Sequence, residues 1–401
     1  MTIPTLLLAL TASIRFLNGF AGVDLPHFDQ ALWLASQGRS PASTVFGEGL
    51  LEDHFSPLLL AFTPLYGLLA SPLWLIVAQV AAAAAAVGQI THRLLPALGW
   101  RRAGLVGTAL LLSPPVVAAL LWDVHAVVFA LPFTLAGVFA VAEDRPVRGL
   151  LFGLVAAGFR PDAAYAVLAA YVFLPRGVRK RGVPAGALLL YVALATFLEF
   201  RLGGGGTGHW DAYYGALGSS PGDALTHPWR VLGQLLSYDS LTKVVPCLIG
   251  GAFLALRRPV LMAPALAAGL PTLLSAWGGT DRWFYHYGIA PVLLLAVAWI
   301  PVYVAHPGRT RQVFALALVI TILAGPFLPR PPDVVAETGV WRSDGQASCI
   351  AKGIPGDATV SSLVRPATFL AHRPTLYYWP YPFAGIPVLP TIAQPSPELI
   401  D

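Results

Sequence analysis

The chain has 401 residues, of which 56% are hydrophobic and only 11% charged, and its mean hydropathy is +0.67. Soluble domains carry roughly a quarter of charged residues, so this composition excludes a water-soluble fold. The two cysteines, Cys247 and Cys349, argue against a disulfide framework and against a cysteine metal site.

The first apolar segment, Thr5 to Phe20, contains Arg15 and Asn18 and lacks a small-residue cleavage site. We therefore expect a retained membrane span rather than a signal peptide, with the N-terminus in the cytoplasm. Longer stretches without Asp, Glu, Lys or Arg follow, for example between Asp53 and Arg93. Each of them meets the requirement of about 20 apolar residues for a helix that crosses the hydrocarbon layer.

The basic residues cluster between these apolar stretches, which predicts that they lie in cytoplasmic loops. The clusters are Arg93, Arg101 and Arg102; Arg145 and Arg148; Arg176, Arg179, Lys180 and Arg181; Arg257 and Arg258; Arg309 and Arg311. This distribution explains the net charge of +5 without a nucleic-acid partner.

With these clusters as inner anchors, the fold class is an all-α polytopic membrane protein with about 11 transmembrane helices. The spans are expected at about 4 to 20, 72 to 92, 103 to 121, 125 to 142, 148 to 160, 163 to 175, 184 to 201, 241 to 256, 259 to 276, 286 to 304 and 312 to 328. The fifth and sixth are of about half length and meet at Phe159-Arg-Pro-Asp162. Such a break is tolerated only where it faces protein or a water-filled cavity, so we expect a polar vestibule there.

Residues 1–329 are thus expected to form the transmembrane domain, with outer loops at about 21–57 and 202–240. In the first loop, Pro26 to Gln37 predicts a helix suited to the membrane interface, and Phe55 to Leu69 a second shallow helix. Residues 330–401 are expected to be an extracytoplasmic C-terminal segment with a small α/β unit, whose strands lie near Ala358–Ser361 and Thr375–Trp379.

Acidic residues concentrate in the first outer loop, where Asp24 and Asp29 flank the start of the expected helix and Asp53-His54 closes the loop. Carboxylates on neighbouring loops can hold a divalent cation, Mg²⁺ or Mn²⁺, or one of them can act as a general base. The alternative for Asp24 and Asp29 is that they stabilise a helix N-terminus.

Asp123 and His125 stand at the outer end of the third span, where they could bind a metal, relay a proton or simply cap the helix. Arg160 and Asp162 lie at membrane depth, where ionisable groups usually face a functional cavity, although a mutual ion pair is the alternative.

Arg282 and His286 could bind an anionic head group, or belong to an aromatic belt with the neighbouring tyrosines. The glycine run Gly203 to Gly206 lacks the Gly-Lys-Ser/Thr ending of a phosphate loop and is expected to be a linker.

Several motifs resemble the bacterial membrane protein family known as domain of unknown function 2079. They are Phe28-Asp-Gln-Ala-Leu-Trp33, Asp53-His-Phe-Ser-Pro57, Pro64-Leu-Tyr66, Asp123-Val-His125, His286-Tyr-Gly-Ile-Ala-Pro291, Ile354-Pro-Gly-Asp-Ala-Thr-Val360 and His372-Arg-Pro-Thr-Leu-Tyr-Tyr378. Where the family shows Lys-Glu-Asp, this chain has Arg160-Pro161-Asp162 and lacks the middle carboxylate. The resemblance covers nearly the whole chain.

The layout of that family resembles the type C glycosyltransferase superfamily, which uses lipid-phosphate-linked sugars at the outer membrane face. The resemblance implies a hexosyltransferase in the bacterial plasma membrane, with membrane lipid and a polyprenyl-phosphate sugar donor as partners. It also implies that an acidic residue of the first outer loop is central to catalysis, for which Asp24 is the best match and Asp29 the next. A transporter or flippase of a lipid-linked or small anionic substrate is the main alternative, and an envelope scaffold protein is the third.

Overall fold

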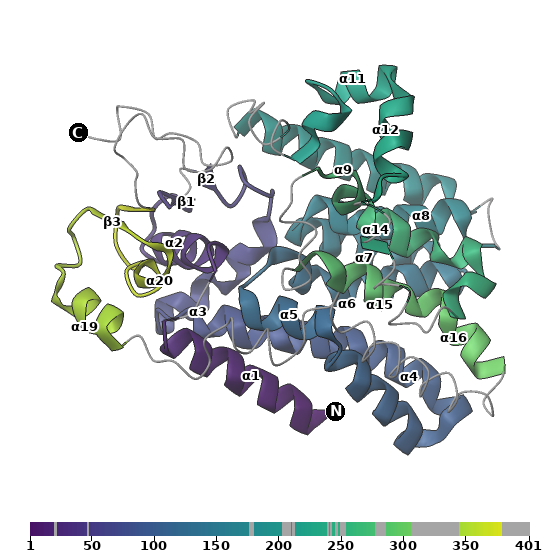
Figure 1. Cartoon of the computed structure of the whole chain (residues 1–401), viewed down its shortest axis with the longest axis horizontal. Coiled ribbons are helices and arrows are strands. Elements are labelled where there is room, and N and C mark those ends of the chain that lie inside the picture. The colour runs from purple at the N-terminus through teal and green to yellow at the C-terminus, as the bar shows by residue number, and fades with distance from the viewer. Residues whose placement is uncertain are drawn as a thin grey trace.

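The computed structural model describes residues 1–19, 22–45, 48–175, 180–202, 210, 213–238, 240, 243–244, 248, 254–276, 286–305 and 345–378. These residues are mostly helical, as Figure 1 shows. The helices up to residue 202 are α1 (Thr2–Leu17), α2 (Asp24–Ser36), η1 (Pro57–Phe62), α3 (Thr63–Leu68), α4 (Leu73–Leu111), α5 (Pro114–Trp122), α6 (Ala126–Ala142), α7 (Pro146–Phe159), η2 (Pro161–Ala164), α8 (Tyr165–Phe173) and α9 (Gly182–Leu202).

The second half adds shorter helices, and each half contains one pair of short strands. The helices are η4 (Gly215–Leu217), α11 (Pro221–Thr226), α12 (Pro228–Leu235), η5 (Leu254–Arg257), η6 (Pro259–Met262), α14 (Ala263–Leu274), η8 (His286–Gly288), α15 (Ile289–Leu294), α16 (Ala296–Ala305), α19 (Gly345–Gly353) and α20 (Val364–Ala367). The strands β1 (Ala42–Ser43) and β2 (Glu48–Gly49) pair antiparallel, and β3 (Val360–Ser362) and β4 (Leu376–Tyr378) pair parallel.

Most of the expected spans have a helix at the expected place, and three helical segments are long and apolar enough to cross a membrane. These segments are Leu73–Leu111, Gly182–Leu202 and His286–Ala305. The half-length pair is present as α7 and η2–α8, and it breaks between Phe159 and Pro161 as expected. The expected span at 312–328 and most of the one at 241–256 lie outside the described residues.

Two expected boundaries differ from the structure. α4 covers the expected second span and the start of the third, and it consists of two helices that meet at Gly99, whose φ of 71° and ψ of 164° are not helical. The expected third span at 103–121 is interrupted, because α4 ends at Leu111 and α5 starts at Pro114. Pro114 and Pro115 lack backbone N–H groups and therefore cannot continue the hydrogen bonds of the preceding helix.

Glycines allow α6, α7 and α8 to pack closely against one another. A Cβ at Gly149 of α7 would lie 2.6 Å from Val141 Cγ2 and 2.9 Å from the Tyr171 hydroxyl, and a Cβ at Gly137 of α6 would lie 2.9 Å from Val167. Small residues at helix contacts are typical of membrane bundles, where close backbone approach supplies the packing energy.

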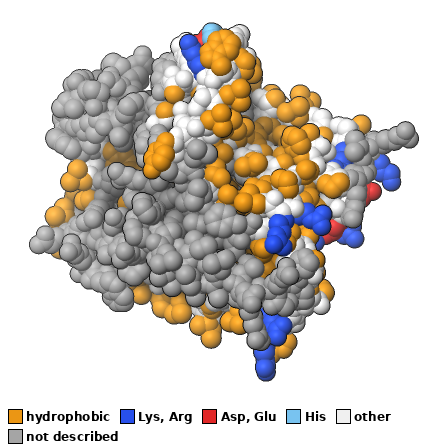
Figure 2. Space-filling view, turned by 45° about the vertical axis from the view of Figure 1, so that its right-hand side comes forward, with side chains coloured by type: hydrophobic (Ala, Val, Ile, Leu, Met, Phe, Trp, Pro, Cys, Tyr) orange, Lys and Arg blue, Asp and Glu red, His pale blue; other side chains and the backbone are white. Residues whose placement is uncertain are grey.

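The periphery of the bundle exposes large hydrophobic side chains. Only 22% of the most apolar stretch of α9 is buried. Four of its large side chains are more than half exposed, namely Leu189, Leu190, Leu194 and Phe197. Figure 2 shows hydrophobic side chains over much of the described face, with Lys and Arg at its margins. Exposed apolar surface of this extent fits contact with lipid hydrocarbon rather than with water.

The helix α2 is enclosed, whereas the sequence led us to expect it on the membrane interface. Nine of its residues are buried, among them the polar His27, Asp29 and Gln30. Figure 1 shows the reason: the C-terminal segment with α19, β3 and α20 lies beside α2, although more than 300 residues separate them in sequence. The expected position on the membrane interface rested on one apolar face of the helix. The C-terminal segment that covers the helix lies too far away in sequence to be predicted from that face.

Replacing Gly149 by Leu is expected to lower the melting temperature of the purified protein, because the new side chain collides with Val141 and Tyr171. Overpacking of this kind costs about 1–3 kcal/mol. The matched control is Gly186→Leu in α9, where a Cβ meets nothing within 4 Å and the helix gains about 0.8 kcal/mol of propensity. Equal melting temperatures for the two variants would contradict the close packing of α6 and α7.

Candidate functional site

The segment Trp122–His125, which joins α5 to α6, is fixed by polar side chains of two other helices. Arg15 of α1 donates a hydrogen bond to the Trp122 carbonyl, and its guanidinium lies 5.6 Å from the centroid of the Trp122 ring. Gln79 of α4 donates to the Asp123 carbonyl at 2.7 Å and accepts from the His125 N–H at 3.3 Å. The extended backbone between two apolar helices is thereby held in one conformation.

Asp123 uses its carboxylate to cap the N-terminus of α2. The N–H of Asp24 donates to Asp123 Oδ2 at 2.8 Å, and the N–H groups of Leu25 and Val124 donate to Oδ1 at 3.0 and 2.8 Å. These donors would otherwise be unsatisfied at the start of the helix. Gly22 makes room for the carboxylate, since a Cβ there would lie 2.1 Å from Asp123 Oδ2. Asp123 therefore has a structural use for both oxygens.

The cap directs the side chain of Asp24 toward two imidazoles from distant segments. Asp24 Oδ2 lies 3.1 Å from His125 Nδ1, and the His125 ring lies 3.8 Å, centroid to centroid, from that of His286 at the start of η8. One donor atom from each of the three residues falls within 4.8 Å of the others. His125 is buried, and the side chain of Asp24 is 30% exposed. The three groups can share a proton or bind a cation.

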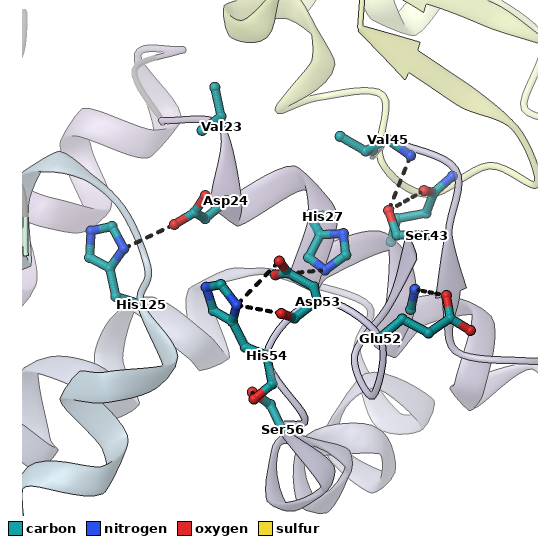
Figure 3. Close-up of polar contacts among 12 residues, drawn as sticks. Val23, Asp24, His27, Ser43, Val45, Glu52, Asp53, His54, Ser56 and His125 are labelled. Carbon is teal, nitrogen blue, oxygen red and sulfur yellow. Dashed lines mark hydrogen bonds and ion pairs between the residues drawn. The ribbon is translucent and has the colours of Figure 1, made fainter. Parts of the chain in front are cut away.

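Three further ionisable side chains, His27, Asp53 and His54, lie near Asp24, as Figure 3 shows. Asp53 Oδ1 lies 3.2 Å from His54 Nδ1, and Asp53 Oδ2 lies 3.8 Å from Nε2 of the fully buried His27. All three belong to the first expected outer loop or to α2 inside it. Asp53 therefore adds a second negative charge near Asp24.

Burial and neighbouring charges shift the ionisation of these groups. Burial, and then the charge of Asp53, raise the pKa of Asp24 to about 7, although His54 and Arg160 act in the opposite direction. A buried acid with a raised pKa beside imidazoles is typical of sites that handle protons or cations.

Arg160 brings a positive charge to the same region from the break between α7 and η2. It pairs with Asp162, with Arg160 Nε 2.8 Å from Asp162 Oδ1, as the ion-pair alternative anticipated. Its charge nevertheless acts on Asp24, since it lowers the pKa of that carboxyl. The pair is only partly enclosed, with 20% of Arg160 exposed, so the guanidinium remains accessible to an anion.

An apolar pocket adjoins the cluster on the side of His286. Tyr287, the next residue in sequence, lines it, and Lys243 and Thr272 are the other polar residues in its mostly apolar walls. The walls come from η6, α14 and α15 and include Met262, Leu266, Gly269, Leu273, Pro291 and Leu295. A long apolar chain could lie in this pocket while a polar group at its end reaches the cluster.

Asp29 does not join the cluster but fastens the C-terminal segment to α2. Its Oδ1 accepts a hydrogen bond from the Tyr66 hydroxyl at 2.7 Å and lies 3.0 Å from His372 Nε2. The His372 ring also stacks on Trp33, with centroids 6.0 Å apart. Asp29 is 2% exposed, so its carboxylate is used within the fold.

Backbone contacts complete this attachment. Gln30 of α2 donates to the carbonyl of Arg373 at 3.1 Å. The Thr44 hydroxyl donates to the Leu376 carbonyl at 2.9 Å and accepts from the Leu376 N–H at 2.8 Å. Residues 371–378 therefore pack against α2 and the segment that follows it.

Of the residues predicted from the sequence, the structure gathers Asp24, Asp53, His54, His125, His286 and the Arg160–Asp162 pair in one region. It gives Asp123 and Asp29 contacts within the fold, and Arg282 lies outside the described residues. The role of Gln79 and the pairing of Asp29 with His372 were not predicted from the sequence. A single Gln inside the apolar stretch from 73 to 92 was the available signal for the first.

The family model described as "Predicted membrane protein (DUF2079)" matches residues 17–385, and the chain belongs to this family of membrane proteins. The family identified from the sequence motifs is thus confirmed. No curated protein matches the chain. Among solved structures, the crystal structure of ArnT from Cupriavidus metallidurans bound to undecaprenyl phosphate is similar over 94% of this chain and 85% of that chain, with 15% sequence identity and a TM-score of 0.49.

The attachment of the C-terminal segment is expected to weaken as the pH rises. Burial alone lowers the pKa of His372, but the charge of Asp29 and the hydrogen bond to it outweigh burial and raise the pKa above the ordinary 6.5. A group whose pKa is raised in the folded state contributes its full stabilisation below its ordinary pKa, and this stabilisation is lost as the pH rises through the raised pKa. Hydrogen exchange of residues 345–378, corrected for the intrinsic rate, should therefore become faster as the pH rises from below 6.5 through the raised pKa of His372.

Asp29→Asn isolates the contribution of the pair, since it removes the charge that raises the His372 pKa. In this variant the segment should exchange faster at low pH and lose most of its pH dependence. His92→Gln, an exposed histidine on α4, is the matched control and should behave like the wild type. An unchanged pH profile in Asp29→Asn would show that the pair does not control the attachment.

Proposed function

We propose that this member of the DUF2079 family is a glycosyltransferase that moves a hexose from a polyprenyl-phosphate donor to an acceptor at the outer face of a bacterial plasma membrane. The observation that supports this most is the meeting of Asp24, His125 and His286 beside the charge of Arg160, next to an apolar pocket. A lipid-phosphate sugar requires an acidic residue, a positive charge near its phosphate and an apolar pocket for its lipid chain, and this region provides all three.

The reaction needs two things from the protein, because the lipid phosphate is already a good leaving group. The acceptor oxygen attacks the anomeric carbon, the bond from that carbon to the phosphate oxygen breaks, and the electron pair leaves with the polyprenyl phosphate. The acceptor must lose its proton, and the departing phosphate must be stabilised by positive charge. In our proposal Asp24 either removes the proton of the acceptor as the base or holds a metal that stabilises the phosphate. Arg160 stabilises the departing phosphate.

The apolar pocket supports a lipid-linked rather than a soluble donor. Its walls from η6, α14 and α15 suit the isoprenoid chain, and Tyr287 lies where this pocket reaches the cluster. An isoprenoid chain in the pocket would leave its phosphate near His286 and Arg160. Concave apolar pockets with few polar groups are common in ligand sites.

The proposal includes the finer arrangement expected from the sequence. The basic clusters assign the N-terminus to the cytoplasm and the loop 21–57, the loop 202–240 and the segment 330–401 to the outer side, with about eleven spans. The contact between α2 and the residues 371–378 is compatible with this assignment, because both then lie on the same side of the membrane.

Asp24→Asn is expected to reduce sugar transfer by at least about 100-fold, since both roles of Asp24 require its negative charge. The assay incubates the purified protein in liposomes with radiolabelled polyprenyl-phosphate hexoses and cell-envelope acceptor. The control is Asp144→Asn, an exposed acid with φ of 59° between α6 and α7, a conformation that Asn also tolerates. This control should retain wild-type transfer.

Full transfer by a monodisperse Asp24→Asn protein would rule out the proposed role of Asp24. Absence of transfer by the wild type with every donor would instead favour a transporter. The discontinuous pair α7 and η2–α8 is the feature that supports this second candidate, because broken helices also build transport sites.

A further inference from the structure

The cluster of Asp24, His125 and His286 has the geometry of a metal site. Two ligand atoms bound to one cation at about 2.0 Å in tetrahedral geometry lie about 3.3 Å apart. The separation of Asp24 Oδ2 and His125 Nδ1 is 3.1 Å, and a donor atom of His286 falls within 4.8 Å of both. A shift of the His286 ring by about an ångström would complete three ligands of such a site.

Imidazole nitrogens at this place are enclosed without a hydrogen-bond partner among the described residues. Both ring nitrogens of His286 and Nε2 of His125 are in this position. Burying polar nitrogens without a partner is costly, and native proteins rarely leave such groups unsatisfied. The His286 ring, which has neither nitrogen partnered within the described part of the chain and lies 3.8 Å from the ring of His125 beside the Asp24 carboxylate, therefore points to a ligand that accepts a lone pair from nitrogen.

The donor set favours zinc over the magnesium or manganese expected from the sequence. Two imidazoles and one carboxylate suit the borderline-soft Zn²⁺, whereas Mg²⁺ prefers oxygen ligands in an octahedral arrangement. Asp123, which was expected among the ligands, uses its oxygens on backbone N–H groups, and Asp53 pairs with His54. Three protein ligands leave a fourth position open, as in catalytic zinc sites.

The surroundings hold two of the three ligands in place without a metal. His125 is fixed through its N–H by Gln79, and Asp24 through its N–H by Asp123. Asp53 adds a nearby negative charge, which favours a cation at the cluster.

We propose that Asp24, His125 and His286 bind a divalent transition-metal cation of the zinc type, whose open position receives an oxygen of the donor phosphate. The role of the open position rests on the proposed function, whereas the binding of the metal does not. Metal binding can therefore be measured without donor or acceptor.

The test uses the full-length protein in detergent, purified without a polyhistidine tag and treated with a chelator. Zinc is then titrated against a chromophoric zinc indicator, and the metal that remains after gel filtration is measured by mass spectrometry. We expect one zinc ion per chain and a higher melting temperature with zinc, but no comparable change with magnesium. His125→Gln and His286→Gln should each weaken zinc binding at least about tenfold, the effect of perturbing a metal site.

The matched control is His92→Gln, which removes an exposed histidine of α4 and should bind zinc like the wild type. The proposal fails if the wild type binds no zinc, or if His286→Gln binds it as tightly as the wild type. If the variants do not fold, X-ray absorption of the zinc-loaded wild type decides, because two imidazoles in the first coordination sphere are expected and none would overturn the site. A zinc-binding protein without transfer activity would contradict the proposed function alone.

Discussion

The hydrogen bonds from the start of α2 to the carboxylate of Asp123 join the segment around α2 to the helical bundle. An N-terminus buried against apolar helices needs acceptors for its N–H groups, and one carboxylate supplies them for two consecutive residues. Asp24 follows from this constraint, because its backbone is fixed by Asp123 while its side chain turns to His125. Gly22 and the bonds made by Arg15 and Gln79 serve the same junction. The chemistry proposed for the site thus depends on a capping interaction that takes no part in it.

A second constraint explains why the C-terminal segment packs on the same loop. The helix α2 buries Asp29 and Gln30 at 2% and 0% exposure, and buried polar groups are costly unless they are hydrogen-bonded. Partners for both come from residues more than 300 positions later in the chain, His372 and Arg373. Together with the bond from Tyr66 to Asp29 and those from Ser43 and Thr44 to Gln30, these contacts satisfy the polar groups of both side chains. The C-terminal segment is therefore part of the packing around α2.

Most helices could be predicted from the sequence, because a long apolar stretch between basic clusters predicts a helix that spans the bilayer. The half-length pair at Arg160 was also visible, since its proline and its two short stretches are local features. The roles of the acids could not be assigned in the same way. Asp24, Asp29 and Asp123 all stand near helix ends, and only distant partners show that Asp24 faces His286, Asp29 faces His372 and Asp123 caps α2. Such pairings depend on how the helices pack, which local patterns do not contain.

In the proposed function, a lipid-phosphate sugar reacts at the place where Asp24, His125 and His286 meet. A cryo-EM structure of the protein with a bound polyprenyl-phosphate hexose would reveal where the donor lies. We expect the phosphate within hydrogen-bond distance, about 3 Å, of Arg160 or of a metal held by the two histidines, with the isoprenoid chain between α14 and α15. A donor bound with its phosphate away from this cluster, and with Asp24 remote from the sugar, would contradict the proposed function.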